Sequence, residues 1–97
     1  MDFSKKNIVL SASLLKSIGH PIRISIILSL NNNTQLTVSE LCNLLLVDQP
    51  IMSLHLGVLR EKSIIRVEKR GKQSVYSITN HSVKQIINIM YNSNINI

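Results

Sequence analysis

Basic side chains are concentrated in one short stretch of the chain. It holds six of the eleven Lys and Arg residues: Arg60, Lys62, Arg66, Lys69, Arg70 and Lys72. Two carboxylates, Glu61 and Glu68, offset them. Lys and Arg neutralise backbone phosphates, and this contact supplies most of a protein's sequence-independent affinity for nucleic acid. The stretch therefore predicts a phosphate-binding surface, and the simpler alternative is a solvated turn with ordinary surface charge.

Side chains able to read base edges precede this stretch. One face carries four residues at helical spacing, Met52, His55, Leu56 and Leu59, and is expected to turn toward the core. The positions left for solvent or DNA are Gln49, Ile51, Ser53, Leu54 and Gly57. Gln can pair with an adenine edge, Ser can serve a base or a phosphate, and Ile and Leu can contact only thymine methyl groups. Because His55 lies on the core stripe, we interpret it as a structural histidine.

The other reactive side chains form no recognisable catalytic or metal site. The three histidines fall on different expected elements, and the chain has neither a Gly-rich phosphate loop nor zinc-hydrolase spacing. We predict that the protein is not an enzyme and uses no metal or cofactor. The single cysteine, Cys42, excludes an internal disulfide and fits a reducing, cytoplasmic setting. It shares an apolar stripe with Leu41 and Leu45, so a buried thiol is favoured over the alternative of a redox sensor.

Two short helices with a tight break between them must position the base-reading residues. The first, 38–45, is preceded by the N-cap Thr37, and Glu40 stands at the spacing of a capping box. The second opens at the N-cap Asp48, with Pro50 in its first turn. Since only two residues separate the first stripe from the next cap, the chain must turn sharply, which predicts a helix-turn-helix over 37–62.

After position 62 the period changes from helical to extended. Residues 64–69 and 73–78 are predicted strands, and the turn at 70–72 joins them into a β-hairpin wing over 64–78. A short extended piece is also expected at 35–37. Most of the basic stretch thus falls on the wing, beside the helix that would read bases.

Helices are expected at both ends of the chain, at about 4–18 and 80–92. A further helix begins at His20-Pro21, after Gly19, and is broken by the Asn run that starts at Asn31. Both terminal helices carry apolar stripes wider than one core-facing surface needs. In a domain this small, the extra apolar surface of these two helices is most simply explained by a symmetric dimer interface.

The length, net charge and composition of the chain fit one small nucleic-acid-binding domain spanning 1–97. The chain has a net charge of +6 and is 44% hydrophobic, which favours a folded domain with a polyanionic partner. Its three aromatic residues argue against the stacking platforms of single-strand binders. We find no signal peptide and no stretch of the ~18 apolar residues that a membrane span requires. The predicted fold is α+β but mostly α: a winged helix-turn-helix with five helices and a two-stranded β-hairpin wing.

These segments resemble the ArsR/SmtB family of bacterial winged helix-turn-helix repressors, over most of the chain from Leu14 to Ile89. The motifs that carry the resemblance are HPIRISIIL, LTVSELCNLL, QPIMSLHLGVLRE and RGKQSVYSI. The resemblance implies a homodimer that binds a palindromic operator in double-stranded DNA and represses transcription until an inducer releases it. It also implies that residues 49–60 form the recognition helix and that the first and last helices form the dimer.

The chain departs from this family at the inducer-binding positions. Where arsenite-type members carry a cysteine pair, it has Thr37 and Ser39, and Cys42 matches an accessory position. Where zinc- and cobalt-type members carry Asp and His, it has Asn80, Ser82, Ser93 and Asn96, with His81 one residue out of register. Amides and hydroxyls are poor ligands for those metals, so the inducer is not predicted to be a metal at these positions. Two alternatives stay open: a winged-helix protein-interaction module, and a DNA-binding protein that responds to no ligand.

Overall fold

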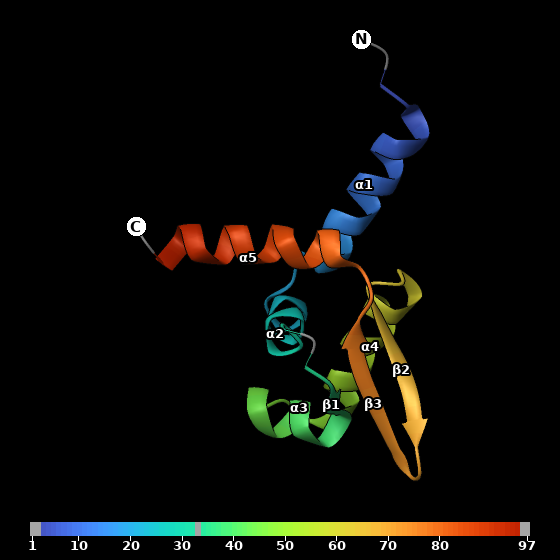
Figure 1. Cartoon of the computed structure of the whole chain (residues 1–97), viewed down its shortest axis with the longest axis vertical. Coiled ribbons are helices and arrows are strands. Elements are labelled where there is room, and N and C mark those ends of the chain that lie inside the picture. Colours follow the sequence, from blue (N-terminus) through green and yellow to red (C-terminus); the bar gives the residue numbers. More distant parts are fainter. Residues whose placement is uncertain (1–2, 33, 96–97) are drawn as a thin grey trace.

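The computed structural model describes residues 3–32 and 34–95. Within them, the order of elements is α1 (Lys5–Ile18), α2 (Pro21–Ser29), β1 (Leu36–Thr37), α3 (Val38–Leu45), α4 (Gln49–Glu61), β2 (Ile65–Arg70), β3 (Gln73–Ile78) and α5 (His81–Ile95) (Figure 1). The predicted winged helix-turn-helix, with five helices and a hairpin wing, is confirmed.

Local capping fixes the two helices of the helix-turn-helix. The Thr37 hydroxyl accepts a hydrogen bond from the backbone N–H of Glu40, and the Glu40 carboxylate accepts one from the backbone N–H of Thr37. These bonds complete the predicted capping box and hold the pKa of Glu40 below its usual value. Leu46 then takes a left-handed backbone conformation with φ 54°, which ends α3. The chain bends by 113° between α3 and α4, a typical angle for a helix-turn-helix.

The core lies where α2, α3 and α4 meet the sheet. Every residue of the predicted α4 stripe is buried, as are Leu41 from α3 and three residues of α2 and its C-cap, Ile26, Ile27 and Leu30. Ile64 and Ile65 close the core from the start of the wing. Because α4 buries one face against all of these groups, its orientation is set by core packing.

The wing is part of a three-stranded antiparallel sheet with strand order β1-β3-β2. In the hairpin, Val67 pairs with Tyr76 and Arg70 pairs with Gln73, while Gly71 supplies the turn with φ 64°. The extended piece predicted at 35–37 becomes β1, in which Leu36 pairs with Tyr76. This third strand covers one edge of the hairpin and fixes the wing to the start of α3.

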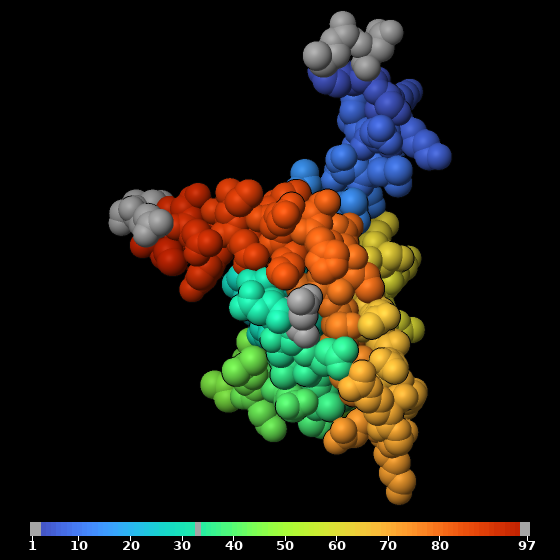
Figure 2. All heavy atoms as spheres, viewed as in Figure 1, coloured from blue at the N-terminus to red at the C-terminus, as the bar shows by residue number. Residues whose placement is uncertain are grey.

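The two terminal helices project from the end of the molecule opposite the wing tip (Figures 1 and 2). Gly19 ends α1, and the Asn80 side chain accepts a hydrogen bond from the backbone N–H of Val83 to begin α5, both as predicted. The last helix runs to Ile95, beyond the predicted end near 92. An amide pair between Asn31 and Asn88 fastens α5 to the end of α2.

Only the last turn of α1 is buried, at Ser17 and Ile18. The other members of its predicted stripe, including Ile8 and Leu15, are exposed. Among the described residues, no single helix is long and apolar enough to cross a membrane, although α3 and α4 taken as a bent pair meet the criteria of length and composition.

Candidate nucleic-acid interface

Helix α4 separates its residues into a buried face and an exposed face. Met52, Leu56 and Leu59 are fully or almost fully buried, and His55 is 6% exposed. All five helix residues proposed from the sequence to contact DNA lie on the exposed side: Gln49, Ile51, Ser53, Leu54 and Arg60. Leu54 is 65% exposed, so the core does not account for this apolar side chain.

Gly57 creates an open position on the same exposed side. A Cβ atom built there would meet no heavy atom within 4 Å. Glycine in a helix interior is about 1 kcal/mol less favourable than alanine. The protein's own packing therefore gives no reason for a glycine here, and the helix backbone is accessible to a molecule that approaches from outside.

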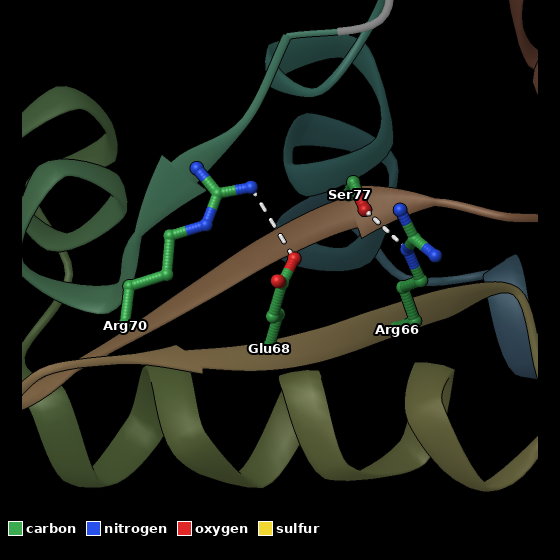
Figure 3. Close-up of polar contacts among 4 residues, drawn as sticks. All are labelled: Arg66, Glu68, Arg70 and Ser77. Atoms are coloured by element: carbon green, nitrogen blue, oxygen red, sulfur yellow. Dashed lines mark hydrogen bonds and ion pairs between the residues drawn. The ribbon is translucent and has the colours of Figure 1, made fainter.

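The basic residues of the wing lie on both of its faces. Arg66 and Arg70 extend from the face of the hairpin that points away from α4 (Figure 3). Strand alternation places Lys69 on the other face, with Val67. The Nε of Arg66 donates to the hydroxyl of Ser77, and Arg70 forms an ion pair with Glu68 at 3.2 Å.

The ion pair between Arg70 and Glu68 affects how freely Arg70 can bind a phosphate. Both of its side chains are about half exposed, and pairs in that setting contribute roughly 0–1 kcal/mol, so phosphate can compete for Arg70. Within the described part of the chain, this is the only salt bridge, and it leaves Arg60, Lys62, Lys69 and Lys72 exposed without a carboxylate partner. The six basic residues thus extend from the end of α4 to the wing tip, with those of the wing on both of its faces.

His55 has partners that the sequence did not reveal. The Nε of Arg23 donates to Nδ1 of His55 at 3.1 Å, and the His20 ring lies 4.3 Å from the His55 ring between centroids. Burial lowers the pKa of His55 below the usual histidine value, and the charges of His20 and Arg23 lower it further. The prediction of a buried structural histidine is confirmed.

Cys42 packs against the core but is less buried than the predicted buried thiol. It is half-buried, because one side packs against the core and the other borders a surface depression with Ser39 and Leu46.

At the positions of the family's metal ligands, the Asn80 oxygen caps α5 and the Ser93 hydroxyl donates to the Ile89 carbonyl. Asn96 lies outside the described residues. In the part of the chain that the structure covers, no three His, Cys, Asp or Glu side chains gather to hold a metal ion.

A sharply bent helix pair followed by a hairpin wing defines a winged helix-turn-helix protein. Residues 20–67 match the arsR family of bacterial regulatory proteins. The chain is 35% identical over 80 residues to the biofilm growth-associated repressor of Xylella fastidiosa, which covers 82% of this chain and 69% of that relative. The chain therefore belongs to the arsR family of bacterial regulatory proteins, as the motifs predicted.

Solved structures agree with this assignment. The fold superposes on HlyU from Vibrio cholerae N16961 with a TM-score of 0.84 at 27% identity, covering 92% of this chain and 96% of the other. It superposes on the transcriptional repressor BigR from Xylella fastidiosa with a TM-score of 0.82 at 33% identity, covering 91% and 89%.

Proposed function

We propose that the protein is a homodimeric transcriptional repressor that binds a palindromic operator in double-stranded DNA. The observation that carries the proposal is the exposed face of α4 beside a wing that carries four exposed Lys and Arg residues. An α-helix fits the major groove, where base edges are distinguishable, and the wing can contact backbone phosphates alongside it. Family membership supports the same function.

The contacts divide by chemistry. Gln49 and Ser53 are proposed to hydrogen-bond base edges, and Ile51 and Leu54 to contact thymine methyl groups. Phosphate contacts are assigned to the basic residues of the stretch: Arg60, Lys62, Arg66, Lys69, Arg70 and Lys72. The first group would set the sequence preference and the second the overall affinity.

The apolar surface of the terminal helices supports the dimer. The exposed apolar residues of α1 are Ile8, Val9, Leu10 and Leu15, and Phe3 lies just before the helix. The exposed apolar residues of α5 are Ile86, Ile89, Met90, Tyr91 and Ile95. An isolated helix of this length is marginal in water, and α1 is buried only at its last turn. A second copy that covers both helices would stabilise α1 and remove this surface from water.

Replacing Gly57 with alanine is expected to separate stability from DNA affinity. The variant Gly57→Ala should gain about 0.5–1 kcal/mol of unfolding free energy, because alanine is the better helix former and the added methyl group meets nothing. It should bind DNA more weakly, because the methyl group stands between the helix and the groove. Chemical denaturation and fluorescence anisotropy measure the two effects. A variant that is more stable and binds DNA with unchanged affinity would show that DNA does not closely approach the helix backbone at Gly57.

Fluorescence anisotropy at several salt concentrations tests the proposed function. The probes are duplex DNA from the protein's own promoter region and a scrambled duplex. Sub-micromolar affinity that favours the promoter and weakens steeply with salt is expected.

Equal, weak binding to both duplexes would favour a winged-helix protein-interaction module, for which the exposed Leu46 and Leu54 would supply the contact surface. Specific binding that no metal, oxidant or small molecule alters would favour the ligand-independent DNA-binding protein.

A further inference from the structure

One guanidinium group joins three helices behind the proposed recognition face. Arg23, in the first turns of α2, donates from Nε to Nδ1 of His55 in the middle of α4 at 3.1 Å. Its terminal nitrogen donates to the backbone carbonyl of Ser17 in the last turn of α1, also at 3.1 Å. Both hydrogen bonds are partly buried, where charge-assisted bonds are stronger than at the surface. Arg23 therefore connects the proposed dimerisation helix with the proposed recognition helix.

The two histidines at this junction both accept hydrogen bonds through Nδ1. His55 accepts from Arg23, and His20 accepts from the backbone N–H of Ile22 as the N-cap of α2. An imidazole whose Nδ1 accepts a hydrogen bond carries its proton on Nε2 and is neutral. The junction as built therefore requires the uncharged form of His55.

We propose that Arg23 and His55 are positioning residues for DNA recognition, and that protonation of His55 opens their link and weakens DNA binding. The proposal rests on the DNA-binding function proposed above. A proton on Nδ1 of His55 would face the N–H of Arg23, so a hydrogen bond would become a contact between two donors and two positive charges. The turn of α4 that holds His55 also carries Ser53 and Leu54 on its exposed side, so a shift of this turn moves the groups assigned to bases.

The charges around His55 all oppose its protonation. The elements packed against α4 are α1, α2, α3 and β2, and the fixed charge acting on His55 is that of Arg23 of α2. A charge on the neighbouring His20 ring would oppose protonation of His55 as well. Because the pKa of His55 is depressed in the folded protein, the neutral junction is fully formed above the unfolded value near 6.5. Its contribution is lost as the pH falls from there through the lower folded value. Acidification below neutral pH is therefore the condition that opens the link.

The pH dependence of operator affinity tests this role in three proteins. In the wild type, affinity should fall as the pH is lowered from about 7.5 through the depressed folded pKa of His55, by up to about tenfold for one pKa unit of coupling. The variant His55→Asn keeps an acceptor near the Nδ1 position and cannot be protonated, so it should lose most of this dependence. The variant His81→Asn removes an exposed histidine of α5 and should keep it.

A second measurement needs no variant of the junction. The chain has three histidines, whose imidazole proton resonances can be followed by NMR in the free protein and in the operator complex. If protonation of His55 opposes DNA binding, linkage requires DNA binding to lower the pKa of His55, by about one unit for a tenfold effect. A pKa for His55 that is unchanged by DNA would overturn the proposal, as would equal pH dependence in His55→Asn and the wild type. Absence of sequence-preferring binding at pH 7.5 would instead refute the function on which the proposal rests.

Discussion

If the proposed dimer forms through α1 and α5, a carboxylate placed on their exposed apolar surface is expected to convert it to monomers and to weaken operator binding by about a hundredfold or more. The variants are Leu15→Glu and Ile86→Glu. These two side chains border the same largely apolar cavity between α1 and α5, of about 220 Å³, and both are more than one-third exposed in the single chain. An unpaired charge is costly to bury in an apolar interface, so the proposed association should be lost. The single chain should still fold, because both side chains are partly exposed in it.

The loss of DNA affinity follows from the loss of the second half-site. A dimer binds a palindrome with both recognition helices, and the second contact is made at high effective concentration, whereas a monomer has only one. Multi-angle light scattering and anisotropy on the same samples measure both effects. The control Asn43→Glu adds the same charge at an exposed position of α3, outside both terminal helices, and should leave the oligomeric state unchanged. A variant that stays dimeric and binds the operator normally would show that these helices do not form the interface.

The elements that the sequence predicted well are those fixed by neighbours in the chain. The capping box of Thr37 and Glu40 involves residues three apart, and the α4 stripe repeats at helical spacing. Gly71 marks the hairpin turn because its positive φ suits glycine. Each of these signals depends on backbone geometry within one or two turns, which a single sequence displays directly.

The features that the sequence did not predict depend on distant pairs. Asn31 and Asn88, 57 residues apart, form an amide pair, and Arg23 and His55, 32 residues apart, share a hydrogen bond. No periodicity encodes such a contact, because it follows from how whole helices pack. The last helix was predicted to end near 92, yet α5 continues to Ile95 although its last turn contains asparagines, which are weak helix formers.

The sequence also did not show which basic side chains of the wing are paired. Counting charges along the sequence gives one basic stretch, but the fold pairs Arg70 with Glu68 and engages Arg66 with Ser77. It leaves Lys69 and Lys72 with no such partner in the described chain. Phosphate contacts from these two lysines therefore displace no protein bond, whereas a contact from Arg70 competes with its carboxylate.

Truncating the two leucines on opposite sides of α4 is expected to separate folding from DNA recognition. Leu59 is 0% exposed and Leu54 is 65% exposed. The variant Leu59→Ala removes the same atoms as Leu54→Ala but leaves a cavity in the core, so it should lose about 2–5 kcal/mol of unfolding free energy. The total unfolding free energy of a small domain is only about 5–15 kcal/mol. The melting temperature of Leu59→Ala should therefore fall by about ten degrees or more.

Leu54→Ala should change the unfolding free energy by less than about 0.5 kcal/mol, because its side chain is in contact mainly with solvent. It should nevertheless weaken operator binding, through the loss of contact with thymine methyl groups. Thermal melts and anisotropy on both variants, at a temperature where each is folded, measure the two effects. Normal operator affinity in Leu54→Ala would remove this residue from the interface, and a small stability loss in Leu59→Ala would mean that the core closes around the cavity. Because both substitutions delete the same side chain from one helix, any difference between them arises from the face on which each leucine lies.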